Sequence, residues 1–291
     1  MIRFHKYRWL YALISFIVIG TGLFSLIRFG YRYSIDFTGG TTMSYKLKKP
    51  IDTKAVEKIL SEMKLRVVHL SFSNAILNIQ TNALTDDQEK KIQTEIKKIN
   101  ANEVQTLRYE TVGPTLGKET GQKTIIAALI AIVGILTYMS FSFKGVNFAL
   151  AAVLAMVHDF FVLICTYSLL SYFFGAEFDL MFVTALLTTM SFSVHDTIII
   201  FDKIREYTKI DKSHTSIEDL TDRAVSETMV RSINNSLTIF FMLSALLLMG
   251  GATIRFFIAA LWIGTITGAY SSPFVATPLL ILLEKRSKNK K

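Results

Sequence analysis

Six apolar runs, each long enough to cross a lipid bilayer, constrain this chain more than any other feature of its sequence. A spanning helix needs about 20 apolar residues to cross roughly 30 Å of hydrocarbon. A water-soluble core does not need runs of that length, so the chain is expected to be a polytopic α-helical membrane protein. We expect the six helices at about Trp9–Ile27, Thr124–Phe143, Phe148–Phe174, Leu180–Phe201, Val230–Met249 and Phe256–Leu283.

The segment between the first two runs is different in kind. It alternates polar and apolar residues, is rich in Lys, Glu and Asn, and contains no spanning run, which indicates a water-soluble domain. Thr85 and Gln88 predict a capping box for its second helix. The order β-α-β-β-α-β predicts an α+β ferredoxin-like domain. Its expected elements are strand Thr41–Leu47, helix Asp52–Met63, strand Arg66–Phe72, a tight Ser73-Asn74 turn, strand Ala75–Gln80, helix Thr85–Ile99 and strand Glu103–Thr111.

Loop charges predict the orientation. Basic residues gather between the fourth and fifth runs, whereas the loop near Gly175 to Asp179 carries only Glu177 and Asp179. Because basic loops stay in the cytoplasm, both termini are expected there, and the soluble domain is expected outside. We divide the chain into 1–33 with the first helix, an exported domain at 34–120, helices two to six at 121–283, and a basic tail at 284–291. The basic loop residues are Lys203, Arg205, Lys209, Lys212 and Arg223.

Net charge and cysteine content exclude two classes of protein. The net charge of +9 is concentrated in short loops and in the tail, so nucleic acid is not an expected partner, whereas membrane lipid is. The single cysteine, Cys165, excludes an internal disulfide framework and is expected to be a small buried side chain.

Asp196 is the most informative residue of the fourth run. A carboxylate within such a run costs on the order of 3 kcal/mol, so something must compensate for it. Thr189, Ser193 and Asp196 recur at i, i+4 and i+7, which places them on one polar stripe, while His195 lies about 100° around the helix. Two interpretations remain open: a bond that locks two helices together, or a proton or ion relay.

The fifth run offers a cationic partner. Arg231, Asn234 or Asn235, and Thr238 recur on one face of the expected helix. Arg231 precedes the apolar residues, so it reaches Asp196 only if the helix begins well before Val230, near Ala224. Otherwise its side chain extends to the membrane surface. The candidate proton relay therefore comprises Asp196, Arg231, Ser193, Thr189, Asn235 and His195.

Three further groups are candidates for function or packing. His158 and Asp159 form a second polar pair in the third run, with helix-helix bonding and a relay role both open. The sixth run carries a small-residue seam for close packing, and glycines flank the soluble domain as hinges or as ordinary turns. The seam comprises Gly264, Gly268 and Ser272, and the hinge or motif residues are Asp36, Gly39, Gly40, Gly113, Pro114 and Gly117.

Several motifs in order along the chain resemble those of the SecD/SecF family of protein-export membrane proteins, and within it the smaller, SecF type. The resemblance covers essentially the whole chain. Its motifs are DFTGG (Asp36–Gly40), VGPTLG (Val112–Gly117), His158-Asp159, SFSVHDTIIIFDKIRE in the fourth run, RSINNSLT (Arg231–Thr238) and GAYSS (Gly268–Ser272).

The resemblance implies half of a twelve-helix unit of the resistance-nodulation-division type, in which proton flow helps to pull polypeptide out of the translocon. It implies SecD as a separate chain, and the SecYEG translocon, YajC, YidC and unfolded polypeptide as partners. The family's fourth-helix acid corresponds to Asp196 and its fifth-helix basic residue to Arg231. This chain departs from the family pattern at Ser191 for Gly, Phe192 for Tyr and His195 for Asn.

Other functions fit the residues less well. A small-molecule or lipid exporter of the same superfamily would need larger exported domains than one of about eighty residues, and a structural scaffold would leave Asp196 without a purpose. No P-loop pattern or zinc-spaced His and Cys set is present, so we expect neither an enzyme nor a cofactor or metal. The proton gradient is the expected energy source.

Overall fold

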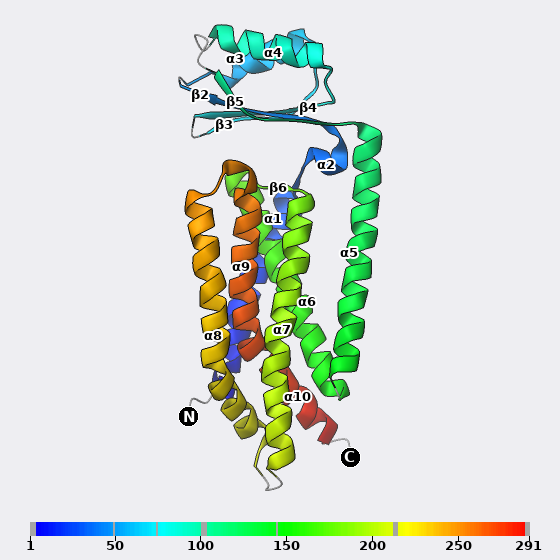
Figure 1. The fold of residues 1–291 in the computed structure, drawn as a ribbon, viewed down its shortest axis with the longest axis vertical. Coiled ribbons are helices and arrows are strands. Elements are labelled where there is room, and N and C mark those ends of the chain that lie inside the picture. The colour runs from blue at the N-terminus through cyan, green and yellow to red at the C-terminus, as the bar shows by residue number, and fades with distance from the viewer. Residues whose placement is uncertain are drawn as a thin grey trace. The chain divides into compact units, whose positions relative to one another are not determined.

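The computed structural model describes residues 4–48, 50–73, 75–99, 104–143, 145–211 and 215–288. The chain divides into two compact units (Figure 1). A membrane unit comprises Met1–Arg32 and Ala127–Lys291, and a soluble unit comprises Tyr33–Ile126.

The membrane unit is helical, as predicted. In the described part of the chain, six helices are long and apolar enough to cross a membrane, and the predicted runs fall within them except that the second was predicted to end at Phe143, one residue past Ser142. The last of these is interrupted by a π-helical turn containing Pro273, which lacks the N–H that a regular α-helix requires. The elements are η1 (Phe4–Tyr7), α1 (Arg8–Phe29), α5 (Pro114–Ser142), α6 (Val146–Phe174), α7 (Leu180–Ile210), α8 (Ile217–Met249), η2 (Ala252–Ile254), α9 (Arg255–Ser271), η3 (Ser272–Ala276) and α10 (Thr277–Lys288).

Helix α8 begins earlier than its apolar run. Its first residue is Ile217, and the Ser216 hydroxyl caps it by accepting a bond from the Asp219 amide at 3.2 Å. The early turns are buried although they are polar, and Asp222 there accepts a bond from the His5 amide at 3.2 Å. The helix therefore starts before Ala224, which meets the condition for the fifth run to face the middle of α7.

Close packing of α7 against α9 depends on small residues. A Cβ built on Gly264 would overlap Thr189, and one built on Gly268 would lie 3.1 Å from the Cβ of Ser193. One turn further on, the hydroxyls of Thr197 and Ser272 lie 2.9 Å apart. Both series advance by four residues in the same direction, so the two helices run parallel along this seam.

The soluble unit has the predicted β-α-β-β-α-β order. Its strands form an antiparallel sheet in the order β3-β4-β2-β5, which is the ferredoxin-like arrangement. Figure 1 shows α3 and α4 on one face of the sheet, where side chains such as Tyr45, Leu60 and Ile92 form a buried core. The elements are β2 (Gly40–Leu47), α3 (Thr53–Glu62), β3 (Val67–Ser73), β4 (Ile76–Thr81), α4 (Asp86–Ile99) and β5 (Val104–Val112); two short strands, β1 (Arg32–Tyr33) and β6 (Glu177–Phe178), lie elsewhere in the chain.

Local details differ from the sequence expectation. The Thr85 amide donates to Gln88 Oε1 at 3.0 Å, which is one half of a capping box. In place of the other half, the Thr85 hydroxyl donates to the same oxygen at 3.2 Å. The predicted Ser73-Asn74 turn and the start of the last strand at Glu103 include residues 74 and 103, which lie outside the described residues.

The glycine motifs that flank the soluble domain contact each other. Gly39 follows the short helix α2 (Ile35–Thr38), which contains Asp36, and has a positive φ of 69°. A Cβ on Gly39 would lie 2.6 Å from the Pro114 Cα, and one on Gly117 would lie 2.5 Å from the Gly39 nitrogen. Within this unit the two motifs form a close-packed backbone junction, while their role as hinges stays a prediction.

Candidate functional site

Asp196 lies in the middle of α7 with only 3% of its surface exposed. Ser232 on α8 is one partner, with its hydroxyl 2.7 Å from both carboxylate oxygens, and Ser272 is a second hydroxyl partner. Ser232 can reach the Asp196 carboxyl group because α8 already begins at Ile217, before its apolar run. The charged position of the fourth span is thus paired with a neutral hydroxyl from the next helix.

The expected ion pair between Asp196 and Arg231 is not formed in this structure. Arg231 is exposed, and no ion pair between these two described residues is present. Consecutive residues of a helix point about 100° apart, so when Ser232 faces α7 its neighbour Arg231 turns away. Asn235 is exposed as well.

Two other predicted members of the Asp196 group lie elsewhere. His195 is exposed, on the side of α7 away from the buried carboxyl group, as its helical position predicts. Thr189 is buried, but its hydroxyl donates to the Leu186 carbonyl at 3.0 Å and its side chain packs on Gly264. Thr189 therefore contributes to helix packing in this structure.

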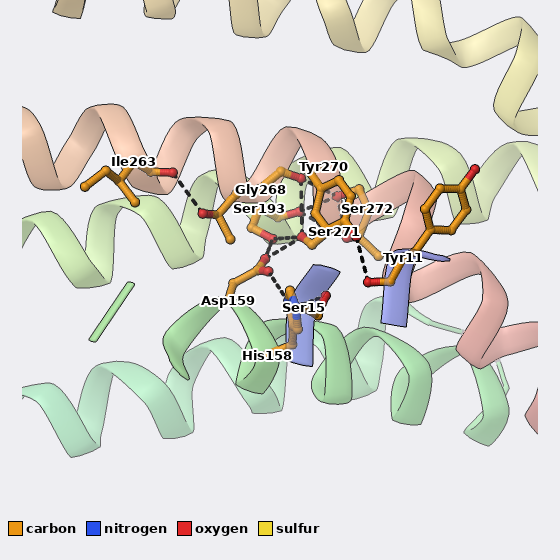
Figure 2. A network of polar contacts seen from close by, with 12 residues as sticks. Tyr11, Ser15, His158, Asp159, Ser193, Ile263, Gly268, Tyr270, Ser271 and Ser272 are labelled. Atoms are coloured by element: carbon orange, nitrogen blue, oxygen red, sulfur yellow. Dashed lines mark hydrogen bonds and ion pairs between the residues drawn. The ribbon is translucent and has the colours of Figure 1, made fainter. Parts of the chain in front are cut away.

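Asp159 on α6 is the centre of a second buried polar network (Figure 2). Its Oδ2 accepts hydrogen bonds from Ser193 on α7 and from Ser271 on α9, the latter at 2.6 Å. Its Oδ1 lies 2.9 Å from His158 Nδ1, and His158 Nε2 lies 2.8 Å from the Ser15 hydroxyl of α1. Ser193, predicted beside Asp196, is therefore a partner of Asp159.

Hydroxyl groups occupy the space along α7 between the two carboxyl groups. The Ser193 carbonyl accepts bonds from Thr197 Oγ1 at 3.1 Å and from Ser272 Oγ at 3.3 Å. The side chains of Ser193, Thr197 and Ser272 are all buried. Asp196 consequently lies on one polar stripe of α7, which the small residues of α9 cover, and Asp159 of α6 bonds to the same stripe through Ser193.

The side chains along this stripe are hydroxyl and carboxyl groups. Among the residues that the structure describes, no group of three or more His, Cys, Asp or Glu side chains could hold a metal. A hydroxyl can both donate and accept a hydrogen bond, so it can serve a carboxylate and a protonated carboxyl group in turn. Buried carboxyl groups with such partners can take up and release a proton without losing their contacts.

Sequence reasoning missed three side chains of these networks: Ser15, Ser232 and Ser271. Ser232 and Ser271 each lie next to a predicted residue, Arg231 and Ser272, so the helix segments were identified but the face was not. Ser15 is a single hydroxyl in an apolar run, and only its contact with His158 distinguishes it.

Comparison with known proteins gives a consistent result. Residues 91–286 match the family model described as "Protein export membrane protein SecD/SecF, C-terminal", and residues 24–51 match "SecD/SecF GG Motif". The chain is 35% identical to the "Protein translocase subunit SecF" of Thermobaculum terrenum, over 98% of this chain and 95% of that one. It is 31% identical to the "Protein translocase subunit SecDF" of Thermus thermophilus, over 89% of this chain and 35% of that one.

A solved structure also resembles this chain. The crystal structure of SecDF from Thermus, described as a translocon-associated membrane protein, matches with a TM-score of 0.83 and 29% identity. The match covers 99% of this chain and 39% of the SecDF chain.

Proposed function

The chain belongs to the SecD/SecF family of protein-export membrane proteins, and on that premise we propose that it is an auxiliary subunit of the Sec translocase. In this role it uses the proton motive force to promote export of unfolded polypeptide across the bacterial cytoplasmic membrane. The names of its relatives, "Protein translocase subunit SecF" and "SecDF", support the translocase role. Six spanning-length helices make it a multi-pass membrane protein.

SecD is the proposed partner. In the Thermus thermophilus relative, named SecDF, this chain corresponds to 35% of the length, which supports association with a SecD part. The SecYEG translocon, YajC and YidC remain expectations from the family.

Burial of Asp196 against neutral hydroxyl groups is the observation that supports a proton-driven function. A carboxyl group is expensive at this depth, and Ser232 supplies only one hydroxyl to both of its oxygens. A purely structural link would be better served by an arginine, which offers five donors. The site therefore favours reversible protonation.

In the proposed cycle, Asp196 accepts a proton from one side of the membrane and releases it to the other. Each proton that crosses supplies about 2.3 kcal/mol per 100 mV of membrane potential. Arg231 is exposed in this structure, which is the withdrawn position that an alternating mechanism requires in one of its states. In the other state Arg231 approaches Asp196 and expels the proton by favouring the charged carboxylate.

The test replaces Asp196 in cells and in inverted membrane vesicles that support secretion. Asp196→Asn keeps the shape but not the titratable group, so insertion and SecD association should persist while proton-dependent secretion is lost. Asp196→Glu should retain part of the activity. Asp202→Asn, at an exposed acid on the same helix, and His195→Asn, which restores the family residue, should both be tolerated. Normal secretion by Asp196→Asn at every external pH would show that Asp196 only bonds helices together.

A further inference from the structure

We propose that the His158–Asp159 pair is a second proton-loading site of this subunit, and that the charge of Asp159 sets how tightly α7 and α9 are held to α6. This inference rests on the proton-driven function proposed above. It concerns a different helix and a different carboxyl group.

Asp159 links three helices through hydrogen bonds, and we call Asp159, Ser193 and Ser271 together the clasp. One oxygen of the carboxyl group, Oδ2, accepts hydrogen bonds from two different helices through Ser193 and Ser271. Both serines are buried, and their own hydroxyls lie 3.5 Å apart. The Asp159 carboxylate on α6 therefore links α6 to both α7 and α9.

His158 supplies a route for a proton to reach this clasp. Its side chain is 12% exposed, against 7% for Asp159, and it lies between Asp159 and Ser15 of α1. Figure 2 shows the order Ser15, His158, Asp159 from α1 inward. The imidazole is thus the more accessible member of the pair.

The groups near the pair include hydroxyls and one carboxyl group further along α7. Helix α9 contributes Tyr270, whose hydroxyl donates to the backbone carbonyl of Tyr11 on α1 at 3.0 Å, and Figure 2 shows the Tyr11 ring pointing away from the pair. The nearest acid on α7 is Asp196, one turn beyond Ser193. Over the described ranges, no lysine or arginine forms an ion pair with His158 or Asp159, so no fixed cation holds the carboxyl group in its charged form.

Uptake of one proton converts the pair from an ionised carboxylate with a neutral imidazole to two neutral groups. With Asp159 ionised and the imidazole neutral, Nδ1–H donates to Asp159 Oδ1 and Nε2 accepts from the Ser15 hydroxyl. An incoming proton adds to Nε2, and the Nδ1 proton passes to Oδ1. The products are a neutral carboxylic acid and a neutral imidazole that carries its proton on Nε2, so one proton has been taken up and no charge remains.

Protonation of Asp159 would weaken the hydrogen bonds that Ser193 and Ser271 donate to it. Hydrogen bonds to an ionised acceptor are roughly twice as strong as those between neutral groups, so Ser193 and Ser271 are held less tightly once Asp159 is neutral. Ser193 lies three residues before Asp196 on the same stripe of α7. A shift of α7 at Ser193 therefore changes the surroundings of Asp196, which couples the two sites.

The first experiment measures protonation directly. The full chain in lipid vesicles is titrated between roughly pH 4 and pH 9, and infrared difference spectra follow the carboxyl C=O bands. Asp159→Asn should remove one titrating band that persists in Asp196→Asn. A spectrum of Asp159→Asn that matches the wild type would overturn the proposal.

Two further variants keep the test decisive if Asp159→Asn does not fold. His158→Gln retains a donor for Asp159 but cannot carry a proton, so it should move the midpoint of the Asp159 band. Ser271→Ala removes one donor to Oδ2 and should shift the frequency of the same band. If neither variant alters any titrating band, Asp159 is not a proton site.

Secretion assays separate this inference from the proposed function. His158→Gln should shift the pH profile of secretion and reduce its proton-dependent part at least about tenfold, whereas a bonding role alone would lower secretion equally at every pH. If Asp196→Asn abolishes secretion but no band responds to Asp159, only the second site is wrong. If the Asp159 band titrates while Asp196→Asn secretes normally, the proposed role of Asp196 fails and the second site stands.

Discussion

Asp159 and Asp196, two buried carboxyl groups of the membrane unit, both accept hydrogen bonds from hydroxyls, and no described lysine or arginine forms an ion pair with either. The Ser232 hydroxyl donates to Asp196, while the Ser193 and Ser271 hydroxyls donate to Asp159. An arginine at hydrogen-bond distance would hold a carboxyl group permanently charged, whereas a hydroxyl adapts to either charge state. Serine partners are therefore compatible with the proton transfer that we propose for these acids.

Tyr45 in the soluble unit gives a pH-dependent prediction. Burial raises the pKa of Tyr45 above its usual 10.0, and its hydroxyl has Met43 Sδ as a weak partner at 3.4 Å. The unfolded chain ionises first as the pH rises, so the stabilising contribution is complete below pH 10 and is lost above it. The free energy of unfolding should fall by about 1.4 kcal/mol per pH unit for this one group.

Urea unfolding of a separately expressed 33–126 segment at several alkaline pH values measures this effect. Tyr45→Phe retains the ring and removes the ionisable group, so its stability should decline less steeply with pH. Equal slopes for the two proteins would show that Tyr45 ionises without unfolding.

Among the helices, the site depends on where α8 begins and on how closely α7 and α9 approach each other. Helix α8 starts at Ile217, which carries Ser232 to the depth of Asp196. Along the α7–α9 seam, glycines at 264 and 268 face Thr189 and Ser193. Small residues let the backbones approach, and this approach places Ser271 beside Asp159.

Gly264→Ala tests the seam. The new Cβ would overlap Thr189, so the helices must separate, and overpacking of this kind typically costs about 1–3 kcal/mol. We expect a lower thermal midpoint of the purified chain in detergent. Thr189→Ala in the same chain should restore part of the loss.

The matched control is Gly20→Ala in α1, where a Cβ would meet no atom within 4 Å. Alanine favours helix over glycine, so this variant should be neutral or slightly more stable. If both alanine variants behave alike, contact along the seam does not limit stability.

Across the whole chain, the surface of one unit suits water and the surface of the other suits lipid. The soluble unit has its own buried core under α3 and α4, and the membrane unit exposes apolar side chains such as Trp9, Phe16 and Phe241. Helix α7 has 31 residues, about 46 Å of length, which exceeds the roughly 30 Å hydrocarbon core. Its basic end, with Lys203, therefore extends into water.

This arrangement predicts topology. Single cysteines placed in a Cys165→Ala background are treated with a membrane-impermeant thiol reagent in intact spheroplasts. A position on α4, such as Lys98, should react without lysis, whereas one at Lys209 should react only after lysis, because basic segments stay in the cytoplasm. The reverse pattern would invert the proposed orientation.

Features that depend on local pattern could be predicted from the sequence. The length of the apolar runs set the six spanning helices, and the alternation between them set the β-α-β-β-α-β order. Helical spacing also placed Asp196 and Ser193 on one stripe with His195 outside it. These inferences hold because burial of apolar surface and backbone periodicity act over a few turns of chain.

Which side chains meet depends on how the helices pack against one another. Arg231 and Ser232 are neighbours in sequence, yet the rotation of α8 about its axis brings the serine to Asp196 and leaves the arginine exposed. In the same way Ser193 bonds Asp159 rather than Asp196, because α6 and α9 both pack on that turn of α7. A rotation of about 100° exchanges one residue for the next, and the rotation of each helix is set by the packing of all its neighbours together.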